Sequence, residues 1–141
     1  MREIDKIIIH CSATQEGKPI SAATIDAWHK KRGWRGIGYH YVVGLDGMME
    51  YGRPVEQPGA HVKGLNKNSI GIVYIGGVEA ERGPDGDWVA KDTRTPEQIA
   101  TLLELLRVLK KLHPDATIHG HNEFAAKACP CFNAYEEYKN L

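Results

Sequence analysis

The segment Lys6-Ile-Ile-Ile-His-Cys11 places three β-branched apolar residues directly before a histidine and a cysteine. Short apolar runs of this kind are typical of a strand that is buried on both faces of a sheet. A second run, Ile70-Gly-Ile-Val-Tyr-Ile75, is apolar almost throughout and predicts another central strand. Together the two segments indicate a sheet whose middle strands are covered on both sides.

Further strands are predicted along the chain. Residues 39–43, Tyr-His-Tyr-Val-Val, predict another strand. Asp46-Gly47 is a typical hairpin turn that leads from it into residues 48–51. Residues 117–121 form a short strand that ends in a histidine. Two stretches rich in polar, Gly or Pro residues have no period, and we expect loops there: residues 54–68 and 79–92.

Three segments carry helix signals, and each begins at a capping residue. Thr95-Pro-Glu-Gln98 combines an N-cap, a proline at the first helical position and the glutamine of a capping box. The expected helices cover residues 22–32 after Ser21, residues 96–113, and a short stretch after Asn133. Strands that alternate with helices predict an α/β domain with a central mixed β-sheet flanked by helices.

The three tryptophans are expected to serve mainly in packing. Trp28 shares the apolar face of the first helix with Ile25 and His29, so we assign it to the core. Trp34 and Trp88 can act as platforms for a sugar or a peptide, but aromatic side chains more often pack against other protein groups.

Length and composition narrow the class of protein. With 141 residues, 42% hydrophobic and 26% charged, the chain fits a single globular domain over residues 1–141, which we expect to be a monomer. Its 18 basic and 18 acidic side chains balance, so we expect no nucleic-acid partner. No apolar run approaches the ~20 residues that cross a bilayer, and the N-terminus lacks the pattern of a signal peptide. We therefore expect synthesis in the cytoplasm without an export signal.

Histidines at two strand ends suggest a metal site. His10 follows the three isoleucines, His121 ends the last strand, and Cys129 follows eight residues later. Two imidazoles and one thiolate leave a fourth position open on a zinc ion, which is the catalytic rather than the structural pattern. An odd cysteine count without an export signal also favours free or metal-bound thiols over disulfides.

Residue spacing leaves alternatives open at this site. His119 lies two residues before His121 on the same strand, and alternation would point both side chains to one face. Cys131 lies two residues after Cys129 and competes with it. His10 can instead be a hydrogen-bonded strand histidine, and Cys129 an inert loop thiol.

Four motifs occur in the order and approximate spacing of a known family. They are His10-Cys-Ser-Ala-Thr14, Gly38-Tyr-His-Tyr41, Asn68-Ser-Ile-Gly-Ile72 and His121-Asn-Glu with Lys127-Ala-Cys-Pro130. The chain closely resembles the zinc-dependent type 2 N-acetylmuramoyl-L-alanine amidases, in particular their phage lysozyme branch, and is more distantly similar to animal peptidoglycan recognition proteins. The resemblance runs from Ile7 to about Phe132 and implies the mixed sheet flanked by helices that the segments predict.

The resemblance also implies a set of site residues. Zinc would be bound by His10, His121 and Cys129, whereas His119 has no ligand counterpart in the motif. Tyr39 and Lys127 match the two non-ligand residues that amidase activity requires. Cys131 departs from the branch, which commonly has a residue without a thiol there. The resemblance further implies that residues 59–68 border the substrate groove, and we expect His61 and Asn66 to contact substrate.

The implied substrate is peptidoglycan, cleaved at the amide between N-acetylmuramic acid and L-alanine. Tyr39 and Lys127 are suited to stabilise the tetrahedral oxyanion of that reaction. Glu50, Glu56 and Glu123 are weaker candidates for a general base than for surface charges, and no paired carboxylates suggest a glycosidase.

The alternative function is a non-catalytic peptidoglycan-recognition module. Non-catalytic relatives lack the zinc-binding cysteine, whereas Cys129 is present here, which favours the enzyme. Because no signal peptide is expected, a phage or prophage lysis enzyme that reaches the wall after release or delivery by another system fits best.

Overall fold

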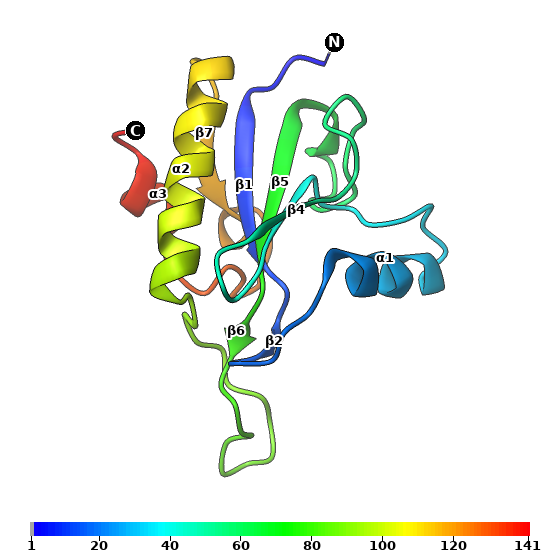
Figure 1. Ribbon diagram of the computed structural model, residues 1–141, viewed down its shortest axis with the longest axis vertical. Coiled ribbons are helices and arrows are strands. Elements are labelled where there is room, and N and C mark those ends of the chain that lie inside the picture. Colours follow the sequence, from blue (N-terminus) through cyan, green and yellow to red (C-terminus); the bar gives the residue numbers. More distant parts are fainter. Residues whose placement is uncertain (1) are drawn as a thin grey trace.

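The computed structural model describes residues 2–141, and its centre is a pair of parallel strands. Strand β1 (Lys6–Cys11) pairs with β5 (Ser69–Tyr74) in a register that sets Ile7 opposite Ile70 and His10 opposite Val73. Both strands are buried almost throughout. The two runs predicted to be central strands are therefore confirmed, and they lie side by side (Figure 1).

Three more strands complete a mixed sheet of order β4-β3-β5-β1-β7. Strands β3 (Tyr41–Val43) and β7 (Thr117–Gly120) are parallel to the centre, whereas β4 (Met49–Tyr51) is antiparallel to β3. The predicted hairpin at Asp46-Gly47 connects β3 and β4. Strand β3 begins at Tyr41, two residues later than predicted, and β7 ends at Gly120 rather than at His121.

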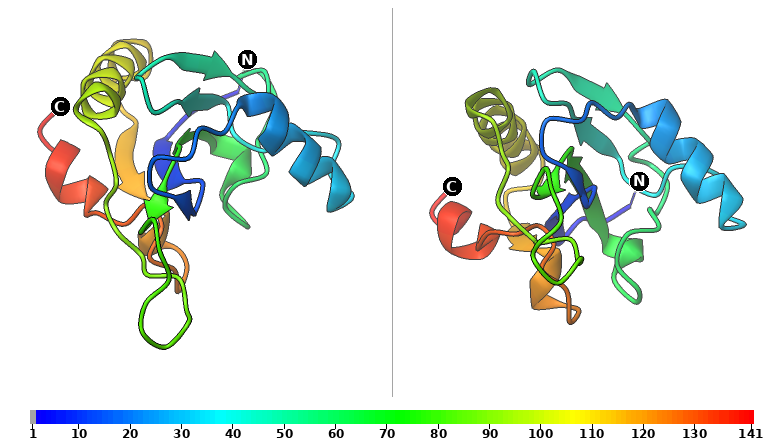
Figure 2. Two further views of the ribbon diagram at one scale, coloured as in Figure 1. Left: turned by 60° about the horizontal axis from the view of Figure 1, so that its bottom comes forward. Right: turned by 90° about the horizontal axis from the view of Figure 1, so that it is seen from below.

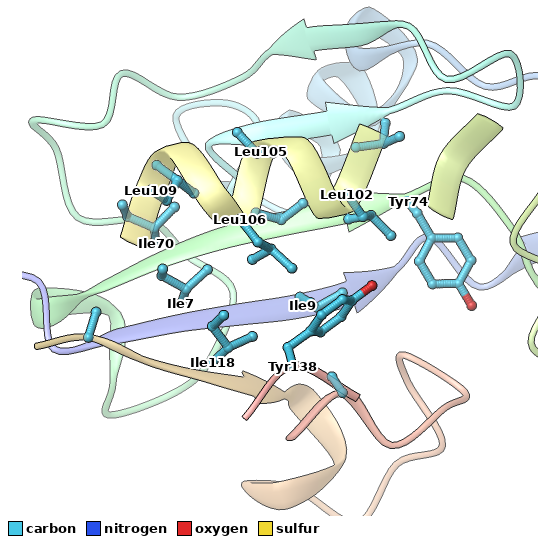
Figure 3. Close-up of a cluster of buried hydrophobic side chains, with 14 of the residues drawn as sticks. Ile7, Ile9, Ile70, Tyr74, Leu102, Leu105, Leu106, Leu109, Ile118 and Tyr138 are labelled. Carbon is cyan, nitrogen blue, oxygen red and sulfur yellow. The ribbon is translucent and has the colours of Figure 1, made fainter. Parts of the chain in front are cut away.

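One face of the sheet is covered by helix α2 (Pro96–Leu112). Its leucines, including Leu102 and Leu106, pack against Ile7, Ile9 and Ile70 in one large core cluster (Figure 3). The predicted capping box is present: the Thr95 hydroxyl accepts from the Gln98 N–H, and the Gln98 side chain accepts from the Thr95 N–H. The short helix α3 (Ala134–Tyr138), capped by Asn133 as predicted, adds Tyr138 to this core.

Helix α1 (Ala22–Lys31) packs on the opposite face, against Val42, Val73 and Ile75. Its buried residues are Ala22, Ile25 and His29, a narrow stripe at helical spacing. The prediction that Trp28 belongs to the core is wrong, because Trp28 lies beside this stripe and remains 39% exposed.

The sequence reading missed a small second sheet beyond the carboxyl ends of β1 and β5. Strand β2 (Thr14–Gln15) pairs in parallel with β6 (Gly77–Val78), and neither strand was predicted from the sequence. Two-residue strands are too short to show a period of two. The predicted loop over residues 79–92 is confirmed as an exposed excursion below this sheet (Figures 1 and 2).

Two single-turn 3-10 helices, η1 (Asn66–Asn68) and η2 (His121–Glu123), directly precede β5 and follow β7. Within residues 2–141, no helix combines the length and apolarity needed to cross a membrane.

Candidate metal centre and substrate groove

The candidate metal centre lies at the carboxyl end of β1. Alternation along this strand turns Ile7 and Ile9 toward α2, and therefore turns His10 toward the other face. There His10 is buried, and its ring lies against the rings of Tyr39, His61 and His121, with centroids 5.0, 4.9 and 4.6 Å away. The parallel arrangement of β1 and β7 places His121, the first residue after β7, at the same edge.

Cys129 reaches this edge from the loop after η2. Its sulfur accepts a hydrogen bond from the backbone N–H of Cys11 at 3.2 Å. His10, His121 and Cys129 each offer one ligand atom, and these three atoms all lie within 4.8 Å of one another. The three residues predicted to bind zinc are thus brought together, with the Nδ1 atoms of the two histidines 3.2 Å apart.

The two competing residues face elsewhere. His119 is held between Thr117 and Glu123, with Nε2 2.6 Å from the threonine hydroxyl and Nδ1 2.8 Å from the carboxylate. Alternation does not align His119 with His121 because the strand ends at Gly120. The Glu123 carboxylate also accepts a hydrogen bond from the Gly120 N–H, so it links η2 to the end of β7.

Cys131 points away from the histidines. Its thiol donates to the Gly77 carbonyl at 3.2 Å, and its sulfur lies 3.9 Å from that of Cys11. It packs against the core cluster on the α2 side of the sheet, and it is not one of the three residues whose ligand atoms converge.

The protonation states of the three candidate ligands suit a metal. Burial, and secondarily the neighbouring His61, lowers the pKa of His10 well below 6.5, and burial lowers that of His121 as well. Hydrogen bonding to Cys11 lowers the pKa of the Cys129 thiol. Neutral imidazoles and a thiolate are the forms that coordinate zinc.

His61 contacts the candidate ligand His10 directly. Nε2 of His10 lies 2.8 Å from Nδ1 of His61, and Nε2 of His61 lies 3.1 Å from the Ser69 hydroxyl. The His61 ring rests on β5 at Gly71, where an added Cβ would lie 2.7 Å from ring atoms. Burial lowers the pKa of His61 to about 3, so the ring is neutral.

Sequence reasoning missed this arrangement around His61. One signal was available: a glycine in the middle of an otherwise apolar central strand often marks the close approach of another group. The partner of that glycine could not be identified from spacing, because His61 lies ten residues away in an aperiodic loop.

A groove of about 480 Å³ opens beside the candidate metal centre. Its lining includes Trp34, His61, Asn66, His121 and Lys127. Asn66 also orders its own loop, because its side-chain oxygen accepts from the backbone N–H groups of His61 and Val62 at 2.9 and 3.0 Å. The roles of His61 and Asn66 as substrate contacts stay predictions.

Tyr39 lies against the ring of His10, and Lys127 is exposed at the rim of the groove. The peptide before Tyr39 is fixed from α1, since the Gly38 N–H donates to Nδ1 of the buried His29 at 2.9 Å. Burial raises the pKa of the Tyr39 hydroxyl, which therefore stays protonated and can donate a hydrogen bond. An ammonium group and a hydroxyl donor thus accompany the candidate ligands.

Comparison with known proteins identifies the family. The family model described as N-acetylmuramoyl-L-alanine amidase matches residues 1–132. The chain belongs to the N-acetylmuramoyl-L-alanine amidase family. The endolysin of Escherichia phage T7 is 38% identical over 129 residues, which cover 92% of this amidase and 82% of the endolysin.

Solved structures agree with this assignment. N-acetylmuramoyl-L-alanine amidase LysC from Clostridium intestinale superposes with a TM-score of 0.78 and 29% identity, over 96% of this chain and 82% of LysC. Bumblebee peptidoglycan recognition protein SA superposes with a TM-score of 0.76 and 26% identity, over 98% and 81% of the two chains. The fold and the family resemblance drawn from the four motifs are confirmed, and the chain is an amide hydrolase.

Proposed function

We propose that this amidase hydrolyses the amide between N-acetylmuramic acid and L-alanine of peptidoglycan, and that it requires one zinc ion. The convergence of His10, His121 and Cys129 beside an open groove is the observation that carries the proposal. A non-catalytic recognition module has no need for this three-ligand set, so the enzyme is favoured over the binding protein.

The donor set fits zinc better than the other common divalent ions. Two imidazole nitrogens and one thiolate are ligands that zinc binds readily, whereas magnesium and calcium prefer oxygen. Bound through three protein ligands, zinc supplies Lewis acidity and lowers the pKa of water.

Tyr39 and Lys127 complete the chemistry from the protein side. Hydrolysis of an amide passes through a tetrahedral intermediate whose oxygen carries negative charge. The Tyr39 hydroxyl can donate to this oxygen, and the Lys127 ammonium can balance its charge from the groove rim. The Tyr39 hydroxyl keeps its proton because burial raises its pKa, so it can donate without a prior proton transfer.

The substrate would lie in the groove with its peptide along His61 and Asn66. The similarity to phage endolysins supports a role in lysis of a bacterial host, in which a phage or prophage enzyme made in the cytoplasm reaches the wall after release. We expect the domain to act as a monomer.

Metal analysis combined with product analysis tests the proposal. The purified protein should contain one zinc per chain, and digested peptidoglycan should release peptides with a free L-alanine amine while the glycan chains stay intact. Cys129→Ala should lose zinc and activity together, and Cys131→Ala, as the matched control, should keep zinc. New reducing sugar ends without free alanine amines would assign the protein to a different reaction.

A further inference from the structure

A second groove, of about 430 Å³, is formed where α1, the small β2–β6 sheet and the excursion over residues 79–92 meet. Two tryptophans from segments far apart in sequence line it: Trp28 of α1 and Trp88 of the excursion. Thr14, Gln15 and Lys18 add a hydroxyl, an amide and an ammonium group. None of these residues lines the groove beside His121.

Both indole rings are available to a ligand. Trp28 is 39% and Trp88 44% exposed. The guanidinium of Arg82 lies 4.8 Å from the centre of the Trp88 ring, which supports the ring within an exposed loop. Two exposed indoles at one groove are unusual, since large aromatic side chains are normally buried.

The position of this groove relates it to the candidate metal centre. Strand β2 begins three residues after Cys11, and β6 begins three residues after β5 ends. The small sheet therefore lies beyond the same carboxyl edge of the main sheet that carries His10 (Figure 1). A polymer attached to a substrate at that edge can extend into the second groove.

We propose that the groove between Trp28 and Trp88 binds the glycan backbone of the cell wall, apart from the site where the amide is cleaved. The inference rests on the proposed function, because that function makes the substrate part of a glycan polymer. The chemistry of the lining matches this ligand. Apolar faces of N-acetylated sugar rings stack on indoles, and hydroxyl and acetamido groups pair with the indole N–H and with the capacity that Gln15 and Thr14 keep beside their bonds to the Ala80 carbonyl and the Ser12 hydroxyl.

The charge of the lining argues against a cationic peptide. The lining contains no carboxylate, and its one charged side chain is Lys18. Of the nearby acidic groups, Glu16 is already paired with Lys91 at 2.8 Å. A neutral polyhydroxylated chain can be bound here without leaving an unpaired charge.

Binding of a sugar oligomer gives a direct test. The probe is a soluble hexamer of β-1,4-linked N-acetylglucosamine, and its dissociation constant is measured by calorimetry and by quenching of tryptophan fluorescence. Trp28→Ala and Trp88→Ala should each weaken binding on the order of tenfold. Tyr51→Ala is the control, because Tyr51 is an exposed aromatic residue on edge strand β4, outside the groove. Thermal midpoints show which variants remain folded, and Trp88→Ala in the exposed excursion keeps the test available if Trp28→Ala unfolds.

Activity measurements separate this inference from the proposed function. Both tryptophan variants should cleave a soluble muramoyl-peptide with a single sugar at the normal rate and intact wall more slowly. The hexamer should also bind to Cys129→Ala, which lacks the metal ligand. Unchanged hexamer binding in both tryptophan variants, or loss of binding to free stem peptide instead of sugar, would overturn the glycan site. Failure of the wild-type protein to cleave the muramoyl-peptide would overturn the proposed function and leave the binding result standing.

Discussion

Nε2 of His10 lies 2.8 Å from Nδ1 of His61, so the ring of one candidate zinc ligand is oriented by a second histidine. This contact leaves Nδ1 of His10 facing Nδ1 of His121. Residues that hydrogen-bond a metal ligand fix its tautomer and its orientation, and their loss typically weakens metal binding about 10–100-fold. Ser69 extends the chain, because its hydroxyl lies 3.1 Å from the other nitrogen of His61.

His61→Phe should therefore bind zinc more weakly, by about one to two orders of magnitude. The phenylalanine ring occupies the space over Gly71 that the His61 ring fills, but it has no nitrogen to hydrogen-bond with His10. Competition with a chromophoric chelator measures the zinc affinity, and His61→Gln, which keeps hydrogen-bonding atoms, should lose less. If His61 only contacts substrate, the zinc affinity of His61→Phe will equal that of the wild type and only KM will change.

The sequence predicted those parts of the molecule that depend on local patterns. The apolar runs around Ile8 and Ile72 and the capping box at Thr95 each carry a signal within a few residues, and each was placed correctly. Trp28 was placed wrongly because helical periodicity shows which residues share a face, but not how wide a stripe the sheet will cover.

Long-range contacts at the site could not be predicted in the same way. Spacing left His119 and Cys131 as competitors of His121 and Cys129. The family resemblance selected between them, and the structure brings the selected residues together. The contact of His61 with His10 joins residues 51 positions apart, and no local pattern specifies it.

Lys127→Ala and Tyr39→Phe should separate catalysis from metal binding. Both variants should keep zinc, because neither residue supplies one of the converging ligand atoms. If the two groups stabilise the oxyanion, each variant should lose on the order of 10²-fold or more in kcat, with a smaller change in KM. Zinc content, thermal midpoint and rate are compared on one wall preparation, and near-normal turnover in both variants would refute the assigned roles.

Gly71→Ala should disturb the site from the middle of a central strand. The added Cβ would lie 2.7 Å from the His61 ring, and the ring has little room to move, because a Cβ added at Gly59 would also meet its Cδ2 atom at 2.7 Å. Forcing a methyl group into such a packed position typically costs about 1–3 kcal/mol. We expect a lower free energy of unfolding in denaturant titration together with weaker zinc binding. Gly64→Ala is a control without a steric clash, although its positive φ adds some backbone strain. Normal zinc affinity in a destabilised Gly71→Ala would show that the site tolerates displacement of His61.

The metal-free protein should lose stability as the pH falls. His61 has a pKa of about 3 when folded, against an ordinary value of 6.5, so the unfolded chain binds more protons between these two values. Stability therefore rises with pH across that window, and the contribution of His61 is complete above pH 6.5 and is lost progressively toward pH 3. The burial that lowers the pKa of His10 acts in the same direction.

Urea titrations of chelator-treated protein at several pH values measure the slope. Carboxylates contribute to it as well, so the comparison is with His61→Phe, which should show a shallower dependence between pH 6.5 and 3. Equal slopes for the two proteins would mean that His61 takes up its proton in the folded state at an ordinary pH, in conflict with its burial between His10 and β5.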